Sequence, residues 1–551
     1  MSALIDTLVG ALVRVIQGGI ALSPTLLIGV FVAAVMRYYF GSDGIKRLFG
    51  NRGLRSLPQS WLIGMLMPVC SIGVLPVLRE MRRSGVSAGA MTAFALSAPL
   101  FNPLSLLYGL TLSRPSIIVF FAMGSLLLVT VLGMLWDWIS PGEGNSETGK
   151  DQFLQEESRQ EDIIGIRRLA AMFVQACREL TGPSLAMALI ALIGVALLAV
   201  VLPFGSMQSS FESDDPWAPL RMVAMGLPVY ATPLLTMSQL GMMFQHANSP
   251  GAAFALLILG SGVNLATPVW FGRNFGWRPT MVWLAILVVV VTGFAYAIND
   301  PLLPRSIQAA GHTHAFDIYS NPIPLGGIDL RMTAENTLRR NVDAISVFAA
   351  ILLVATMAIG VVLRLIGIDE SWLAVSKEAS NREGQLASQA SVVEAGENGE
   401  PKSGGWDIII PPWVVGAVML AGLVAFSIVA CFAYYPPPDQ CLKEAAIARA
   451  ECLSAAGSGN PEHALYWIPI WKDWSRRLEV GVFIRKGSVR PYQSMQGFLI
   501  RKKLDTLEHE LAHLTEHDEG DHGHTHNPSD VRALVSDLLI ANTRWTAAFR
   551  D

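Results

Sequence analysis

The chain contains ten long apolar stretches separated by polar segments. They cover about 10–37, 60–78, 86–112, 115–138, 183–204, 222–245, 250–272, 279–298, 342–367 and 411–434. A helix needs roughly 20 apolar residues to cross the hydrocarbon core of a bilayer. None of the stretches shows the apolar–polar alternation over about ten residues that is typical of membrane β-strands. The pattern therefore predicts an all-α polytopic membrane protein.

Two of the stretches are interrupted by paired prolines. Pro68 and Pro76 bracket the first interruption, and Pro228 and Pro233 bracket the second. Proline removes a backbone donor and breaks a helix. Broken backbone at membrane depth is tolerated only where protein covers it or where it lines a cavity. We therefore expect these four prolines to shape re-entrant hairpins or discontinuous helices.

Charges around the interrupted stretches indicate which side of the membrane their ends face. Basic residues flank the first stretch on both sides: Lys46, Arg47, Arg52, Arg55, Arg79, Arg82 and Arg83. The positive-inside rule places both ends in the cytoplasm, which a hairpin satisfies and a full span does not. The second stretch follows the acidic segment FESDDPW and precedes an uncharged loop, so both of its ends can lie outside.

The two interrupted regions also resemble each other. Pro68-Val69 matches Pro228-Val229, Gly89-Ala90 matches Gly251-Ala252, and Asn102 matches Asn264. With one hairpin and three spans in each half, the second half is inverted relative to the first, an arrangement typical of secondary transporters. The expected fold has about eight spans and two re-entrant hairpins. The alternative is ten full spans, in which the prolines only kink helices and the repeats are parallel.

Composition narrows the class further. Of 551 residues, 52% are hydrophobic and only 15% are charged, which excludes an ordinary soluble enzyme. A net charge of −4 provides no basic surface for nucleic acid, and five cysteines are too few for a disulfide scaffold. The expected partners are membrane lipid and a small-molecule solute. The sequence indicates neither a required cofactor nor an oligomeric state.

The pattern divides the chain into six segments. We expect a first permease repeat at 1–138, a polar cytoplasmic linker at 139–182, a second repeat at 183–298, an outer loop at 299–341, two additional spans at 342–434 around a disordered loop at 376–405, and a soluble His-rich region at 435–551. Counting spans places that last region outside the inner membrane, in the periplasm. Cys441 and Cys452 could form a disulfide there.

The stretch from about 59 to 112 resembles the ArsP-type predicted permease family. The resemblance lies in Pro68-Val69-Cys70-Ser71, in Gly73 to Pro76, and in the small-residue helix that runs through Ala98-Pro99 to Asn102-Pro103; it extends over roughly 10–298. It implies an inner-membrane secondary permease that exports trivalent organoarsenicals. The family pattern resembles Cys-Ser-Cys at the break, whereas this chain has Ile72 at the third position and keeps only Cys70. A single thiol binds a soft centre less tightly than two or three.

The candidate substrate-binding residues lie at the two breaks. They are Cys70, Ser71, Asn102, Tyr230 and Asn264. Cys70 could instead be a small buried hydrophobe, and the two asparagines could simply terminate helices. No Lys, Asp or Glu is expected deep within the spans of the repeat, which favours a neutral solute or an anion held by helix N-termini. Alternating access with gating hairpins is the expected mechanism.

The segment LEHELAHLTEHDEGDHGHTHN near the end of the chain is rich in histidine. Its candidate metal ligands are His509, His513, His517, His522, His524 and His526, which suit zinc or another soft divalent metal. His509, Glu510 and His513 also match H-E-x-x-H, so a membrane-anchored zinc metallopeptidase is a rival hypothesis. A polar tail without metal is a third possibility. An uncoupled channel or subunit is a further alternative to transport, and we expect no enzymatic activity.

Overall fold

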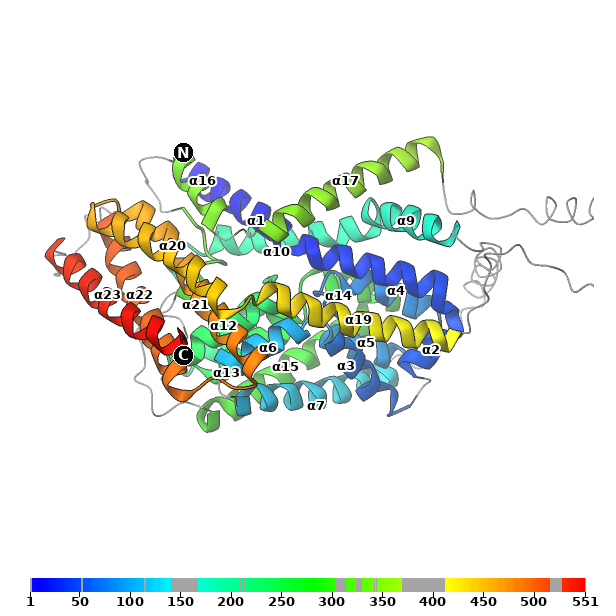
Figure 1. The fold of residues 1–551 in the computed structure, drawn as a ribbon. Coiled ribbons are helices and arrows are strands. Elements are labelled where there is room, and N and C mark those ends of the chain that lie inside the picture. Colours follow the sequence, from blue (N-terminus) through cyan, green and yellow to red (C-terminus); the bar gives the residue numbers. More distant parts are fainter. Residues whose placement is uncertain are drawn as a thin grey trace, which may run out of the picture.

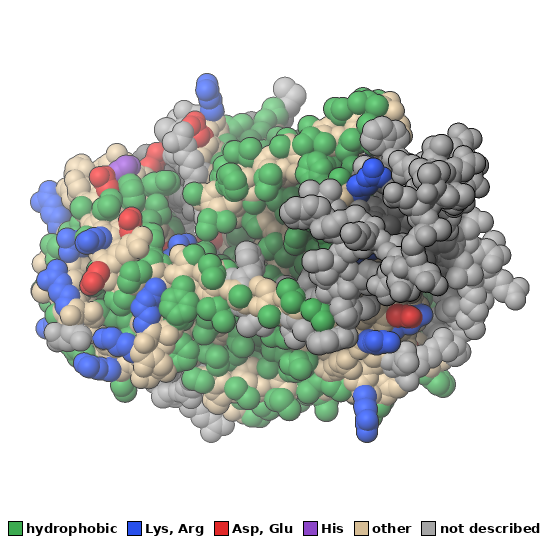
Figure 2. Space-filling model, turned by 45° about the vertical axis from the view of Figure 1, so that its right-hand side comes forward, with side chains coloured by type: hydrophobic (Ala, Val, Ile, Leu, Met, Phe, Trp, Pro, Cys, Tyr) green, Lys and Arg blue, Asp and Glu red, His purple; other side chains and the backbone are tan. Residues whose placement is uncertain are grey.

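The computed structural model describes most of the chain. The described residues are 2–50, 53–112, 115–139, 167–207, 211–212, 214–302, 314–323, 330–340, 342, 344–368, 412–515 and 528–550. Every regular element among them is a helix. The long helices run beside one another across the molecule (Figure 1). Hydrophobic side chains cover its middle, while charged side chains are most numerous at one end and a smaller number lie at the other (Figure 2).

Several described helices are long and apolar enough to cross a membrane. Five segments qualify: Leu4–Phe49, Pro115–Ile139, Arg167–Val201, Trp277–Leu302 and Ala344–Ile366. The first comprises α1 (Ser2–Val35), the π-helix η1 (Met36–Phe40) and α2 (Gly41–Phe49); the others are α7, α9 (Arg167–Leu180) with α10 (Pro183–Val201), α15 and α17. A sixth candidate is the pair Pro250–Ser261 and Ala266–Phe275, bent by 55°. The polytopic all-α prediction is confirmed.

The first proline-interrupted stretch folds as a hairpin. Helix α3 (Ser56–Leu66) leads into a break, and α4 (Val74–Arg83) leads back. At the start of α3, Gln59 Nε2 donates to the carbonyl of Leu48 in α2 at 2.8 Å. Just beyond α4, a Cβ on Gly85 would lie 3.7 Å from Lys46 of the same helix α2. Both ends of the stretch therefore lie at the same end of the molecule.

The second interrupted stretch returns in the same way. It consists of α11 (Ala218–Gly226), a break, and α12 (Pro233–Gln245). Asn248 and Ser249, after α12, both donate at 3.1 Å to the carbonyl of Phe211, which precedes α11. Both interrupted stretches therefore fold back on themselves, as the hairpin interpretation expects, while the number of membrane spans stays a prediction.

Broken helices follow both hairpins, and the two halves repeat the same contacts. In the first half α5 (Ala88–Ser97) is followed by α6 (Pro103–Leu112); in the second, α13 (Pro250–Ala255) and η3 (Leu256–Ser261) are followed by α14 (Ala266–Phe275). Ser87 caps α5 and Ser249 caps α13. Gly89 N donates to Asp137 at 2.7 Å, and Gly251 N donates to Asn299 at 3.1 Å. The two halves are thus built alike at matching residues.

Glycines let the hairpin tips approach the long helices. A Cβ on Gly29 of α1 would lie 2.0 Å from the carbonyl oxygen of Gly73, and one on Gly194 of α10 would lie 2.4 Å from that of Pro228. Real Cβ atoms do not approach so closely, so each break packs directly against a helix backbone.

Two segments expected to be polar connections pack into the helical bundle. Within the linker, α9 contacts α1 and α17 and buries Ala171 and Cys177. Within the outer loop, residues 314–323 bury Phe316, Tyr319 and Asn321. Arg14 of α1 is buried and donates to the carbonyl of Ser320 at 3.0 Å. The expected disordered loop at 376–405 lies outside the described residues.

The C-terminal region forms a helical unit with its own core. After α16 (Leu330–Arg340), α17 and α19 (Pro412–Tyr434), the chain continues through α20 (Pro438–Gly457), α21 (Pro461–Lys486), α22 (Pro491–Thr515) and α23 (Pro528–Arg550). Trp471 and Trp545 are buried in this core.

The disulfide expected in this region is wrong. Cys441 and Cys452 are both free and buried on α20. A helix rises about 1.5 Å per residue, so eleven residues separate their Cα atoms by roughly 16 Å, whereas a disulfide needs less than about 7 Å. Burial raises the pKa of each thiol to about 12, so both stay protonated.

Candidate functional site

Four helix breaks lie together between the two halves. They are the segments 67–73, 98–102, 227–232 and 262–265. Asn264 Nδ2 donates to Ser71 Oγ at 2.8 Å, so the first hairpin contacts the broken helix of the second half. Ser261 Oγ donates to the carbonyl of Pro99, so the two broken helices also meet. The two halves therefore contact each other through residues at the breaks.

Cys70 and Tyr230 occupy matching positions in the two hairpin breaks and lie close to each other. Cys70 is fully buried, and its Sγ accepts from Gly73 N at 3.3 Å. The Tyr230 side chain neighbours both Cys70 and Thr25 of α1. Its hydroxyl is buried and lies close to both of these side chains, but neither contact has the geometry of a full hydrogen bond. A buried hydroxyl whose hydrogen bonds are poorly formed is costly, so this position is suited to a polar group of a bound solute.

The two predicted asparagines serve different contacts. Asn264 bridges to the first hairpin and also accepts from Ala266 N at 2.7 Å, at the start of α14. Asn102 Oδ1 accepts from Ser105 N at 2.7 Å, which caps α6. Ala231 stands where the first hairpin has Ser71, so the second hairpin provides no hydroxyl for a corresponding bridge. Both asparagines lie at the starts of helices, and of the two only Asn264 also forms a side-chain hydrogen bond between the halves among the described residues.

The prolines shape the breaks, with one difference from the expectation. Pro68 and Pro228 lie in non-helical backbone, and Pro233 is the first residue of α12. Pro76 lies inside the first turn of α4 rather than in the break, because the missing N–H is tolerated there. Helices α4, α6, α12 and α14 all begin at the breaks. Their N-termini carry partial positive charge, which favours an anionic or polarised solute.

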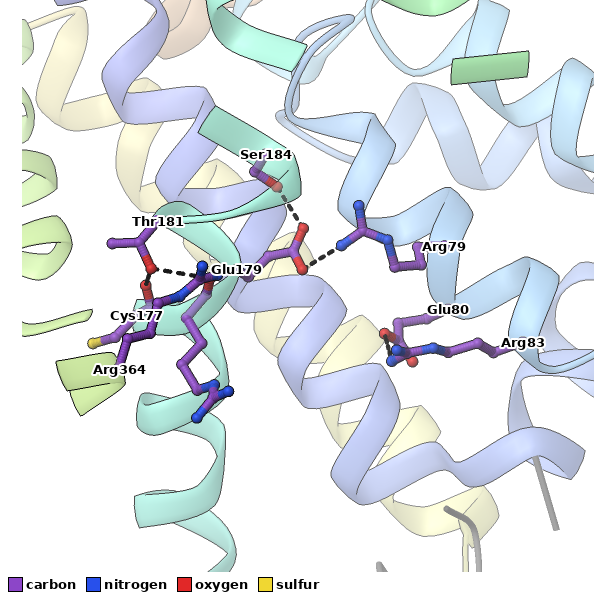
Figure 3. A network of polar contacts seen from close by, with 9 residues as sticks. Arg79, Glu80, Arg83, Cys177, Glu179, Thr181, Ser184 and Arg364 are labelled. Atoms are coloured by element: carbon purple, nitrogen blue, oxygen red, sulfur yellow. Dashed lines mark hydrogen bonds and ion pairs between the residues drawn. The ribbon is translucent and has the colours of Figure 1, made fainter. Parts of the chain in front are cut away.

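A charged cluster that the sequence interpretation missed lies between the first hairpin and the second half. Arg79 of α4 pairs with Glu179 of α9, and Glu179 also accepts from Ser184 Oγ at 2.6 Å (Figure 3). The neighbouring Glu80 is buried and pairs with Arg83 at 2.9 Å. Helix α4 extends beyond the predicted apolar stretch at 60–78, so Glu80 is buried in the bundle although it lies outside the expected spans. The i, i+3 spacing of Glu80 and Arg83 indicates an ion pair on one face of a helix. The sequence interpretation treated this segment only as a basic flank.

The predicted metal ligands lie mostly outside the described structure. His509 and His513 both lie on α22, four residues apart, but the side chain of His513 is outside the described set, as are His517, His522, His524 and His526. Among the described residues no group of three or more His, Cys, Asp or Glu side chains is arranged to hold a metal. The metal site and the peptidase alternative therefore stay predictions.

Comparison with known proteins identifies the transmembrane part. The profile of the ArsP-type family, described as "Predicted permease", matches residues 14–300. The chain belongs to this permease family. The chain is also 31% identical over 83 residues to UPF0718 protein YcgR of Bacillus subtilis (strain 168), a match that covers 15% of this chain and 28% of that relative. No solved structure matches the chain significantly.

The family match covers the whole candidate site, since residues 14–300 include both hairpins and all four breaks. The Arg79–Glu179 pair, which lies outside the breaks, also falls within the matched residues. The permease is therefore a multi-pass membrane transport protein. Helices α17 and α19 to α23 lie beyond the matched part.

Proposed function

We propose that this permease is a secondary transporter that binds a small thiophilic or neutral solute between its two hairpin breaks. The observation that carries the proposal is the Tyr230 hydroxyl, buried without a well-aligned partner beside the Cys70 thiol. Together they offer one soft ligand and one hydrogen-bonding group to the same solute. Ser71, Asn264 and Asn102 shape the surrounding breaks.

Inverted repeats and alternating access follow from the same proposal. Helices α1 and α10, each packed on one hairpin tip, run in opposite directions (Figure 1). This supports a twofold relation within the membrane plane, which places a solute site near the bilayer midplane. Each hairpin would then gate one side of the membrane, because the two enter from opposite ends.

The orientation in the inner membrane is also proposed. Helices α2 and α4 carry Lys46, Arg47, Arg82 and Arg83 at one end of the bundle, and α20 to α23 lie at the opposite end (Figure 1). The positive-inside rule then places the C-terminal region on the outer side. A His-rich tract in that position could capture zinc or another soft divalent metal.

A trivalent organoarsenical is the proposed substrate, because Cys70 provides a soft thiol at the first break. With Ile72 in place of a second thiol, the site would bind such a solute less tightly and would admit other small solutes. Nothing in the described residues favours a peptidase, so we propose a transport function without enzymatic activity.

The test is uptake of trivalent methylarsenite into energised everted membrane vesicles. Wild-type protein should accumulate the solute, and Cys70→Ser should lose accumulation. Cys177→Ser is the matched control, because Cys177 is also buried but lies on α9, away from the breaks. No accumulation above empty vesicles would overturn the arsenical substrate. Flux that neither saturates nor exceeds equilibrium would favour the uncoupled channel.

A further inference from the structure

Glu80 is the one fully buried carboxylate in the described part of residues 2–302. Its side chain belongs to a residue only 5% exposed. It lies on α4, the arm of the first hairpin that begins at the Cys70 break. An ionisable residue buried in a membrane protein is costly, and such residues commonly mark ion or proton pathways. The proposed solute site does not use this carboxylate.

The charges around Glu80 come from three elements. Arg83 and Arg79 lie on α4 itself, Arg37 lies on η1, and Glu179 lies on α9. Arg83 Nη1 donates to Glu80 Oε1 at 2.9 Å, whereas Arg79 pairs with Glu179. The Arg79–Glu179 pair therefore ties α4 to the linker helix α9, and the Glu80–Arg83 pair stays within α4.

The partner of Glu80 can reach water when the pair breaks. The Arg83 side chain is 30% exposed, whereas that of Glu80 is 6% exposed. A long arginine side chain can keep its stem buried and turn its charged head into water. Protonation of Glu80 would therefore not leave a buried cation without a partner, which is the usual cost of breaking a buried pair.

The carboxylate is present on one hairpin only. Aligning Pro68 with Pro228 places Leu240 of α12 at the position of Glu80. A proton bound at Glu80 would act on the first hairpin alone, and it would do so seven residues beyond the end of the break at Gly73. The asymmetry fits a single coupling group in an otherwise repeated architecture.

We propose that Glu80 is the proton-coupling carboxylate of this permease. One proton adds to the carboxylate, the pair with Arg83 opens, and Arg83 turns toward water. The neutral carboxyl no longer attracts Arg37 of η1, so the first hairpin, with Cys70 and Ser71 in its break, is then free to shift against η1. Release of the proton restores the pair. The inference rests on the proposed transport function.

The test separates driven transport from exchange. Purified protein in liposomes is given methylarsenite, and two readouts are compared: accumulation driven by an imposed pH gradient, and gradient-free exchange with preloaded methylarsenite. Wild type should show both. Glu80→Gln should lose the response to the gradient and keep exchange. Glu80→Asp should retain both, and Glu179→Gln, the matched control, should retain the gradient response.

Three outcomes contradict the coupling role. Glu80→Gln could keep its gradient-driven accumulation, or it could lose exchange and accumulation together while still eluting as a folded monodisperse protein. Glu179→Gln could lose the gradient response selectively, which would assign the proton to that carboxylate instead. Absence of exchange in wild type would instead overturn the proposed substrate.

A second measurement decides the proton site without any solute. Infrared difference spectra of the purified protein, recorded between about pH 5 and pH 9, should contain a protonated carboxyl band that Glu80→Gln removes. A spectrum unchanged by the substitution overturns the proposal even if methylarsenite is not transported.

Discussion

At the residue scale, the site combines one thiol with one hydroxyl that has no well-aligned partner. Cys70 and Tyr230 occupy matching positions in the two hairpins, yet they differ in chemistry. Ser71 and Asn264 hydrogen-bond across the halves, while Ala231 leaves the second hairpin without the equivalent hydroxyl. The repeated architecture thus contains a single, asymmetric set of polar groups at its centre.

Replacing Tyr230 by Phe tests the role of the hydroxyl. Because the group is buried without a well-aligned partner, its removal should leave the melting temperature in detergent unchanged or higher. If the hydroxyl binds solute, the KM for methylarsenite should rise roughly fivefold, the value of a hydrogen bond worth about 1 kcal/mol. A lower melting temperature with an unchanged KM would show that the hydroxyl is structural.

At the element scale, the hairpins depend on close approach of the breaks to α1 and α10. The paired prolines and the charge pattern of the flanking segments were enough to predict both hairpins, because proline chemistry and charge are local properties. The recurrence of Asn102 and Asn264 predicted that the second half repeats the first.

The packing of α9 and of residues 314–323 could not be predicted from local pattern. These segments are polar in part, and they pack through contacts with elements far away in sequence, such as Arg14 with Ser320. The bridge between Asn264 and Ser71 was likewise not predicted, although both residues were candidates. Glu80 was missed because a carboxylate among three arginines was interpreted as part of a basic surface.

Adding one methyl group at Gly194 tests the hairpin contact. The Cβ of Gly194→Ala would lie 2.4 Å from the carbonyl oxygen of Pro228, so we expect a loss of about 1–3 kcal/mol in the free energy of unfolding. Gly19→Ala is the control, since Gly19 lies within α1 and a Cβ there meets no atom within 4 Å. In thermal unfolding experiments in detergent, Gly194→Ala should have a lower melting temperature than the wild type, and Gly19→Ala should not. Equal effects of the two substitutions would contradict the contact.

At the scale of the whole molecule, the C-terminal helices dock onto the second hairpin. Arg476 of α21 donates to Ser238 of α12 at 3.2 Å. Asp505 of α22 lies 3.4 Å from His246, directly after α12, and also pairs with Lys472. The C-terminal unit is therefore joined to a hairpin that the proposed mechanism requires to move.

The Asp505 contact predicts a pH dependence of docking. Burial raises the pKa of Asp505, but Lys472 and His246 outweigh it and hold that pKa well below its usual range. A carboxylate with a lowered pKa in the folded state stabilises the fold above its unfolded pKa of about 3.9, and this contribution is lost as pH falls through the folded value. Below about pH 4 the wild type should therefore lose stability, and Asp505→Asn should lose less. An identical acid dependence in both proteins would contradict the assignment.

Alternating access requires that Cys70 lie at a solute site that opens to each side of the membrane in turn. We would label a variant in which Cys70 is the sole cysteine with a small membrane-impermeant thiol reagent, in right-side-out and in everted vesicles. We expect labelling from both sides, slowed by methylarsenite, and no labelling after Cys70→Ser. Labelling from one side only, or from neither side of a folded protein, would contradict it.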